Sequence, residues 1–279
     1  MLGESSVSVV LRGGLGNQLF GWAAGLSLAE RLGTKLVLLG RAIRRKDRHI
    51  LDPRTFELGY FGLAEASGVE NFVVSRFSQR PAFRERGFEY DPRFQEISEP
   101  VTLDGYFQSW RYFQAVQPLV RSSLLSRMSL TQEARAAWND ESEEDWIGVH
   151  VRRGDYEKVG VMALPGPDYY SKAIARAKES TGARRVCVFS DDILAARHAV
   201  PSADRFLGPG DISRAGDVLN LLSRSSALIG ANSSLSWWAA YLGGSRQTVK
   251  IFPSNWFSDA SVDCSDLLPS NWETIVDRP

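Results

Sequence analysis

Two adjacent arginines stand out among the residues of this chain that could carry chemistry, in the segment His150-Val151-Arg152-Arg153-Gly154-Asp155-Tyr156. The apolar run Trp146–Val151 predicts a buried strand, so the arginines lie at its carboxyl end. A guanidinium is permanently charged and binds a diphosphate bidentately. Arg152 or Arg153 would stabilise the charge that grows on a departing nucleotide diphosphate, without a metal ion. The structural alternative is an Arg–Asp pair that pins a domain boundary, because buried ion pairs are often structural.

A second polar segment, Asn232-Ser233-Ser234, follows a predicted strand over 227–231 and opens a predicted helix over 235–242. Asn and Ser are favoured N-cap residues, and the free N–H groups of a helix N-terminus bind phosphate. Capping needs only one such residue, whereas three stand in a row here. The segment therefore predicts a phosphate-binding loop, with simple capping as the alternative.

A glycine-rich segment, Gly14-Leu15-Gly16-Asn17-Gln18, joins a predicted strand over 7–11 to a predicted helix that ends at Leu32. Leu19 stands where the dinucleotide fingerprint needs a third glycine, and the next strand lacks a terminal acidic residue. A nicotinamide-dependent oxidoreductase is therefore disfavoured. Gly14 and Gly16 still let a ligand approach the backbone, and Asn17 and Gln18 suit sugar hydroxyls. A tight turn that needs a positive φ is the alternative.

Three acidic residues and a serine are further candidates for the nucleotide. Ser190, Asp191 and Asp192 end a predicted strand over 185–189, where they would bind a ribose or base, or cap the following helix. Asp217 would accept two hydrogen bonds from a guanine edge, or it is a charge at the start of a helix.

The elements that must position these residues form two α/β domains. A strand–loop–helix–strand unit opens the chain, and regular alternation of strands and helices resumes at Trp146. The acidic run 140–145 predicts a boundary, with domains at 1–143 and 144–279. Two such domains leave a cleft between them, and parallel sheets bind ligands at the carboxyl ends of their strands.

Composition narrows the class of protein. The 279 residues carry a formal net charge of zero, which argues against nucleic-acid binding. No apolar run is long enough for a membrane span, and the N-terminus lacks the pattern of a secretory signal. The three histidines and two cysteines are scattered, so no metal site is expected. We therefore expect a cytoplasmic protein, in which the basic run 41–48 is a solvated loop or a peripheral contact with an anionic acceptor or lipid surface.

Together, five segments resemble the α-1,2-fucosyltransferase family, and they extend over nearly the whole chain. They are Gly13–Phe20, Gly105–Ser109, His150–Tyr156, Phe189–Asp192 and Asn232–Trp238. The His-x-Arg-Arg-Gly-Asp string is shared more loosely with α-1,6- and protein O-fucosyltransferases. Leu235 stands where the family more often has Phe, and an N-terminal anchor of the animal type is lacking, which favours a bacterial enzyme.

The resemblance implies a GT-B architecture, with two Rossmann-like domains facing a cleft. It implies GDP-β-L-fucose as donor, and as acceptor the 2-hydroxyl of a galactose-terminated oligosaccharide or glycoconjugate. The linkage would be α, formed by inversion without a metal or other cofactor. The arginine pair would contact the diphosphate and 232–234 the phosphate or nucleotide. The candidates to bind guanosine would be Asp217 and either Asp191 or Asp192. Residues 14–18 would face fucose or the acceptor.

The catalytic base is left open, with Asp155 preferred over His150 and His150 over Glu157. Asp155 equally suits a structural partner of Arg153, and His150 a hydrogen bond to the nucleotide. Two other functions fit the same residues. One is a fucosyltransferase of another linkage or acceptor class, and the other is a non-catalytic sugar-nucleotide-binding protein.

Overall fold

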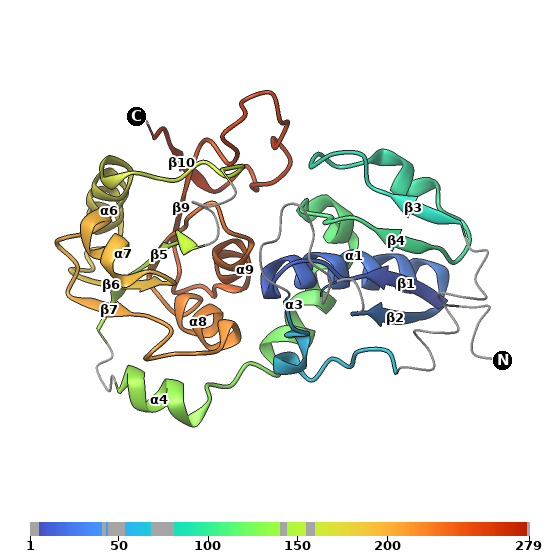
Figure 1. Ribbon diagram of the computed structural model, residues 1–279, viewed down its shortest axis with the longest axis horizontal. Coiled ribbons are helices and arrows are strands. Elements are labelled where there is room, and N and C mark those ends of the chain that lie inside the picture. Colours follow the sequence, from blue (N-terminus) through green and yellow to red (C-terminus); the bar gives the residue numbers. More distant parts are fainter. Residues whose placement is uncertain are drawn as a thin grey trace. The chain divides into compact units, whose positions relative to one another are not determined.

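The structure of the chain, a computed structural model, describes residues 6–40, 43, 54–67, 81–139, 144–154 and 160–277. The chain forms two compact units (Figure 1). Unit 1 comprises Met1–Arg127 and Val262–Pro269, and unit 2 comprises Met128–Ser261 and Ser270–Pro279. Each unit contains a parallel sheet, so the predicted α/β class is confirmed.

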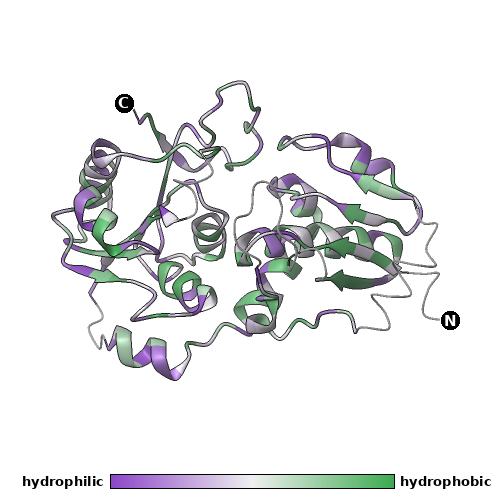
Figure 2. Cartoon of the chain, viewed as in Figure 1, coloured by the Kyte–Doolittle hydropathy of each residue, from purple (hydrophilic) through white to green (hydrophobic). Residues whose placement is uncertain are grey.

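Unit 1 is built on a four-stranded parallel sheet of order β2-β1-β4-β3. Its strands are β1 (Ser6–Val10), β2 (Lys35–Leu39), β3 (Ala82–Arg84) and β4 (Thr102–Asp104). Helix α1 (Leu15–Leu32) joins β1 to β2, which confirms the predicted βαβ unit. Gly25 lets α1 lie close to the sheet, because a Cβ there would stand 2.4 Å from the Val9 side chain. Figure 2 shows the hydrophobic character of β1 and β2.

Aromatic rings fill the rest of the core of unit 1. They come from segments that include the 3-10 helices η1 (Leu58–Phe61), η2 (Pro92–Glu96) and η3 (Trp110–Val116), the last of which leads into α3 (Gln117–Leu125). Tyr112 is 1% exposed and makes edge-on contacts with Phe94 and Phe107. These three rings therefore form part of the core of unit 1.

Unit 2 is built on a six-stranded parallel sheet of order β10-β9-β8-β5-β6-β7. Its strands are β5 (Trp146–Val151), β6 (Arg185–Ser190), β7 (Arg205–Leu207), β8 (Ala227–Ile229), β9 (Val249–Pro253) and β10 (Glu273–Ile275). Its helices are α4 (Gln132–Trp138), α6 (Pro167–Thr181), α7 (Ile193–Ala199), α8 (Ala215–Leu222) and α9 (Ser234–Leu242). Figure 1 shows α6 and α7 on one face of this sheet and α8 and α9 on the other.

Alternation along β5 explains these two layers. Ile147, Val149 and Val151 join the core that includes α6 and α7. Gly148 faces the other way, where an added Cβ would stand 3.2 Å from Leu222 of α8. His150 shares the parity of Gly148, so its side chain lies on the α8 and α9 face.

The observed division differs from the predicted domains at two places. Residues 128–143 fall in unit 2, because Trp138 of α4 packs on Trp146 and Phe189, and Arg205 donates a 2.7 Å hydrogen bond to the Trp138 carbonyl oxygen. Residues 262–269 fall in unit 1, where Asp266 pairs with Arg111 at 2.9 Å. The basic run 41–48 and most of the acidic run 140–145 lie outside the described residues.

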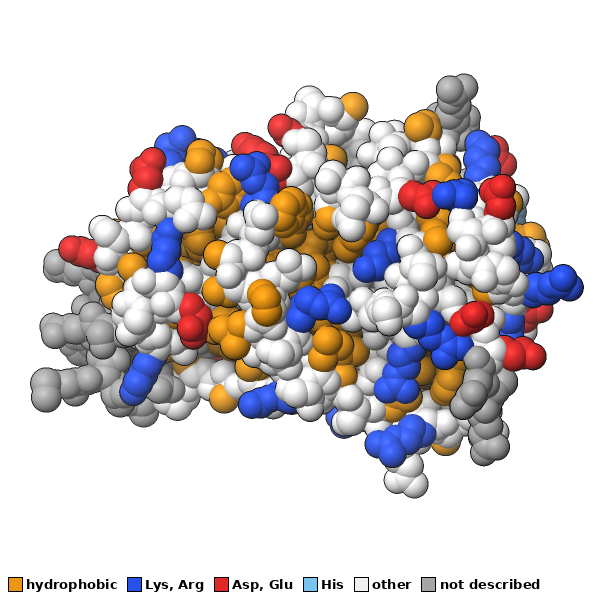
Figure 3. Space-filling model, turned by 180° about the vertical axis from the view of Figure 1, so that it is seen from behind, with side chains coloured by type: hydrophobic (Ala, Val, Ile, Leu, Met, Phe, Trp, Pro, Cys, Tyr) orange, Lys and Arg blue, Asp and Glu red, His pale blue; other side chains and the backbone are white. Residues whose placement is uncertain are grey.

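On the face drawn in Figure 3, Lys and Arg side chains are interspersed with Asp, Glu and apolar side chains. Across the whole sequence the 33 basic and 33 acidic residues balance, which agrees with this mixed surface.

Candidate active site

The arginine pair follows the central strand of unit 2, and one aspartate holds it in place. Val151 of β5 pairs in register with Ser190 of β6, so Arg152 lies opposite Asp191 just past the strand ends. Asp191 Oδ2 is 3.1 Å from Arg152 Nη1, and Asp191 Oδ1 accepts a 2.9 Å hydrogen bond from the Arg153 amide. Asp191 thus braces both arginines, and the nucleotide contact predicted for it stays a prediction.

The two arginine side chains are held differently. Arg153 donates through Nη2 to the carbonyl oxygen of Pro165 at 2.6 Å, so its guanidinium fastens a neighbouring loop. The Arg152 side chain is 24% exposed and keeps its ion pair with Asp191. Of the two guanidinium groups, that of Arg153 fastens a loop, and that of Arg152 is the one we consider for a ligand.

The Asp191 carboxylate that holds the arginines also leaves no room for a side chain at Gly154. Its φ is +25°, and an added Cβ would stand 2.2 Å from Asp191 Oδ2. Any side chain here would displace the carboxylate that holds the arginines. The candidate bases Asp155 and Glu157, which come next, lie outside the described residues.

His150, at the end of β5, is a neutral buried imidazole. It is 4% exposed, and burial, with the nearby charge of Arg152, lowers its pKa to about 3. Its Nδ1 atom is buried and has no hydrogen-bond partner among the described residues. A group with so low a pKa binds a proton poorly near neutral pH, so this environment disfavours His150 as a general base. A buried ring nitrogen without a partner fits the alternative, a hydrogen bond to a ligand.

Ser190 and Asp192 shape the turn between β6 and α7. Asp192 Oδ1 accepts a 3.0 Å hydrogen bond from the Ala195 amide, and the Ser190 hydroxyl bridges the Asp192 amide and carbonyl. Asp192 is therefore the N-cap of α7, which is the capping alternative. Neither side chain shows a contact that singles it out for a nucleotide.

The segment 232–234 contains one loop brace and one helix cap. Asn232 donates through Nδ2 to the carbonyl oxygens of Ala163 at 2.6 Å and Asn255 at 2.9 Å. Its Oδ1 atom is buried with no partner among the described residues. Ser233 is the N-cap of α9, and Ser234 is the first residue of that helix. The run of three polar residues thus combines capping with a buried acceptor that the fold leaves unused.

Asp217 contacts another part of unit 2. It is 1% exposed, and its two oxygens accept hydrogen bonds from the Thr131 amide at 3.0 Å and the Thr131 hydroxyl at 2.7 Å. These bonds attach the N-terminus of α4 to α8. The prediction that Asp217 binds guanine thus has no support in the described contacts, because the carboxylate is buried against Thr131.

In unit 1, the glycine-rich turn has its positive φ one residue before the predicted segment. The positive φ of +63° belongs to Gly13, whereas Gly14 is the N-cap of α1, with φ −82°, and Gly16 lies within the first turn of α1. An added Cβ at Gly13 would stand 2.4 Å from Asn17 Nδ2. The positive φ of the tight-turn alternative therefore falls at Gly13, just before the segment, and the ligand role of Gly14 and Gly16 stays a prediction.

Gln18 and Asn17 differ in the partners that they bind. Gln18 is fully buried, where it donates to the Gly13 and Thr55 carbonyl oxygens at 3.0 and 2.8 Å and accepts from the Glu57 amide at 3.0 Å. It is an internal brace rather than a sugar ligand. Asn17 accepts a 2.7 Å hydrogen bond from Gln108, so the first two family-like segments meet at the sheet edge.

Comparison with known proteins shows the family. The sequence profile of "Glycosyl transferase family 11" matches residues 69–275. The chain belongs to glycosyl transferase family 11. This match confirms the family predicted from the five segments.

Curated relatives include two whose names state a 1,2 or 2-alpha linkage and one named only as a glycosyltransferase. An alpha-1,2-colitosyltransferase of Escherichia coli is 26% identical over 97% of this chain and 99% of its own length. The O-antigen biosynthesis glycosyltransferase WbnK of Escherichia coli is 24% identical over 94% of this chain and 98% of its own length. The mouse galactoside 2-alpha-L-fucosyltransferase Sec1 is 29% identical over 52% of this chain and 42% of its own length.

A solved structure supports the fold. The NodZ alpha-1,6-fucosyltransferase, from a crystal soaked with GDP-fucose, matches with a TM-score of 0.51 and 19% identity. The match covers 85% of this chain and 92% of NodZ. The chain thus has the predicted GT-B fold, with its two Rossmann-like units. Among the described residues, no helix is long and apolar enough to cross a membrane.

Proposed function

We propose that this chain is an inverting glycosyltransferase that moves L-fucose from GDP-β-L-fucose to the 2-hydroxyl of a galactose-terminated oligosaccharide or glycoconjugate. The product would be an α-1,2 linkage. The observation that carries the proposal is the arginine pair at the carboxyl end of β5, held by Asp191 in a family of glycosyl transferases. The names of the relatives support an α-1,2 linkage, and the mouse relative supports fucose and a galactoside.

Two buried polar atoms favour a donor site beside the arginines. His150 lies in β5 and Asn232 follows the adjacent strand β8, and neither His150 Nδ1 nor Asn232 Oδ1 has a hydrogen-bond partner among the described residues. A buried polar atom left unpaired costs free energy, on the order of 1–3 kcal/mol, which a bound ligand would recover. Asn232 Oδ1 can only accept, so it would suit a hydroxyl or N–H group of the nucleotide, whereas His150 Nδ1 could donate to a nucleotide oxygen when it carries the proton.

The proposed reaction is a single displacement. The acceptor oxygen forms a bond to the anomeric carbon of fucose while the bond from that carbon to the diphosphate oxygen breaks, through an oxocarbenium-like transition state. The Arg152 guanidinium would stabilise the charge that develops on the departing GDP. Because this charge is supplied by a side chain, we expect no metal requirement. The proton of the acceptor hydroxyl would pass to a base, for which Asp155 and Glu157 are now preferred over His150.

A second donor is favoured by one relative. The colitosyltransferase aligns with nearly the whole chain, whereas the mouse fucosyltransferase aligns with about half of it. Colitose differs from L-fucose in lacking the 3-hydroxyl, so the two donors present nearly the same ring. Direct competition between GDP-fucose and GDP-colitose would therefore decide which donor the chain prefers.

The deciding experiment incubates the purified chain with GDP-fucose or GDP-colitose and a panel of galactosides. Mass spectrometry and NMR of the product identify the sugar and its linkage. We expect an α-1,2-fucosylated galactoside, with full activity in excess EDTA. Arg152→Ala should lower kcat about a hundredfold, the usual order for losing one preorganised charge contact. The control, Arg176→Ala, removes an exposed ion pair with Glu273 in the same unit and should leave kcat unchanged.

Several outcomes would contradict the proposal. An Arg152→Ala variant as active as Arg176→Ala would remove the diphosphate role. A strict need for Mn²⁺ or Mg²⁺ would contradict the metal-free reaction. A chain that binds GDP-fucose but makes no product with any acceptor would be a sugar-nucleotide-binding protein. The cytoplasmic location stays a prediction, tested by fractionating the cells that produce the chain.

A further inference from the structure

Glu85 lies beneath the loop that follows β4 in unit 1. Arg84 pairs in register with Asp104, so Glu85 and Gly105 begin neighbouring loops at the carboxyl edge of the sheet. Glu85 Oε2 accepts hydrogen bonds from the amides of Tyr106 at 2.7 Å and Phe107 at 2.9 Å. An added Cβ at Gly105 would stand 2.7 Å from that oxygen, so the glycine makes room for the carboxyl group.

The loop has an unfavourable backbone conformation at Phe107. Its φ is +53°, in the left-handed region that a bulky side chain rarely occupies. The ring is fully buried and packs against Phe83 and Tyr112. Such strain persists only where the surroundings hold it, and it clusters at ligand sites. The two bonds to Glu85 hold the amide of the strained residue and the amide just before it.

The same loop carries groups that suit a sugar. The half-buried Tyr106 ring stacks against Phe88, with ring centroids 6.3 Å apart. Gln108 Nε2 donates to Asn17 Oδ1 at 2.7 Å, so an amide pair links this loop to the glycine-rich turn. A partly exposed ring offers an apolar face and an amide pair offers donors and acceptors, which together match a pyranose. Because the proposed donor residues belong to unit 2, we assign these groups to the acceptor.

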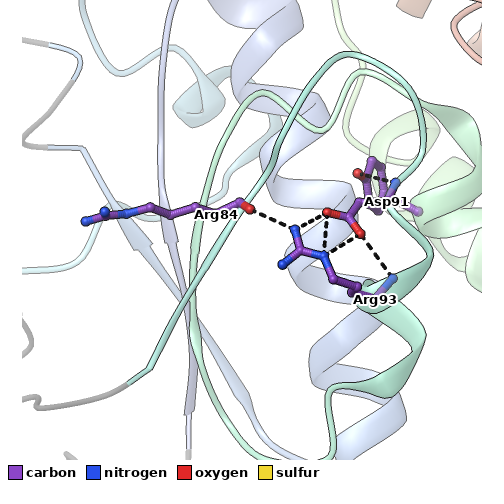
Figure 4. Close-up of polar contacts among 4 residues, drawn as sticks. Arg84, Asp91 and Arg93 are labelled. Carbon is purple, nitrogen blue, oxygen red and sulfur yellow. Dashed lines mark hydrogen bonds and ion pairs between the residues drawn. The ribbon is translucent and has the colours of Figure 1, made fainter.

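The carboxyl group of Glu85 changes its charge near neutral pH. Burial raises its pKa to about 7, against the lowering effects of the Phe107 and Tyr106 amides and the Tyr112 hydroxyl. The nearby Asp91 carboxylate raises it further, although Arg93 neutralises much of that charge. Figure 4 shows the Arg93 guanidinium directed at the Asp91 carboxylate and at the Arg84 carbonyl oxygen. Protonation of Glu85 near neutral pH would weaken its charge-assisted bonds to the loop.

We infer that Glu85 is a positioning residue for the acceptor: its carboxyl group holds residues 105–108 so that the Tyr106 ring and the Gln108–Asn17 pair receive a galactoside. The inference rests on the proposed function, because that function makes the acceptor a sugar.

The test compares Glu85→Ala, Glu85→Gln and the control Glu89→Gln, an exposed neighbour. Hydrogen–deuterium exchange of a peptide covering 105–109 needs no activity and reports on the loop directly. We expect faster exchange in Glu85→Ala alone. In assays with GDP-fucose and lactose, Glu85→Ala should raise the acceptor KM about tenfold, the order expected for losing a hydrogen bond to a charged group. The donor KM should not change.

The conservative variant separates positioning from a general loss of structure. Glu85→Gln keeps an oxygen that accepts from both amides but cannot titrate, so it should restore most of the acceptor affinity. In the wild type, the acceptor KM should rise as pH falls through about 7, because the ionised carboxylate holds the loop more strongly. That rise should be absent in Glu85→Gln.

Unchanged exchange of 105–109 in Glu85→Ala would overturn the inference whatever the activity of the chain. So would a change confined to the donor KM, or an identical pH profile in Glu85→Gln and the wild type. If the wild type forms no product from GDP-fucose and any galactoside, the proposed function fails, and the acceptor role of Glu85 fails with it.

Discussion

Acidification should destabilise unit 2 through His150. The imidazole is 4% exposed, lies next to Arg152, and has a pKa of about 3 in the fold against 6.5 for an unperturbed histidine. Between these values the unfolded chain binds a proton that the folded chain does not. A depressed pKa therefore contributes stability that is complete above pH 6.5 and is lost as pH falls towards 3.

The size of the effect follows from the pKa difference. At pH 5, about 1.5 units below the unfolded pKa, the loss is about 2 kcal/mol, at about 1.36 kcal/mol per unit. Glu85 in unit 1 acts in the opposite sense, because its pKa is raised from 4.5 to about 7. Its stability contribution is present below 4.5 and is lost as pH rises through 7, so acidification to pH 5 returns about 2 kcal/mol.

The assay is urea unfolding at pH 7.5 and pH 5, for the wild type and His150→Gln. The difference between the two proteins at pH 7.5 is subtracted from the difference at pH 5, which removes the packing cost of the substitution. We expect His150→Gln to gain about 2 kcal/mol in this double difference. If the two units unfold in separate transitions, the gain should appear only in the transition of unit 2.

The matched control is Leu194→Ala, an exposed residue on α7 of the same unit that carries no titratable group, so it should give a double difference near zero. Glu85→Gln should give a change of the opposite sign, in the transition of unit 1. A His150→Gln variant with the pH dependence of the wild type would refute the reasoning, because it would mean that His150 titrates alike in the folded and unfolded chains.

Two further pairs of variants test the arginine loop. Asp191→Ala removes the ion pair with Arg152 and should raise the donor KM about tenfold. Asp192→Ala removes the N-cap of α7, so it should lower the free energy of unfolding by about 1 kcal/mol and leave the donor KM unchanged. Initial rates and urea unfolding distinguish the two, and equal donor KM values would contradict the bracing role of Asp191. Gly154→Ala should abolish most activity, because its Cβ would meet Asp191 Oδ2. Gly160 also has a positive φ but lies in open space, so Gly160→Ala should cost only about 1–2 kcal/mol of stability. Activity of Gly154→Ala close to that of Gly160→Ala would rule out this contact.

Much of the fold could be predicted from periodicity alone. The range predicted for β5 coincides with the observed strand, and α1 ends at Leu32 as predicted. Long apolar runs and helical spacing are local signals, so they survive in the sequence. The short strands β3 and β4 were not predicted, because three residues carry too little periodicity. Glu85 was missed for the same reason, since it directly follows the short strand β3.

The sequence by itself determined the family, the order of the main elements and the strand ends at which polar residues gather. Whether each polar residue braces the fold or faces a ligand was decided by the tertiary structure. Asp217 is occupied by Thr131, 86 residues away, and Gln18 by Thr55 and Glu57, while Asp191 holds the arginines across the β5–β6 edge. The physical reason is that a hydrogen-bonding group is defined by its partner. Those partners are brought together by folding, and no local spacing records them.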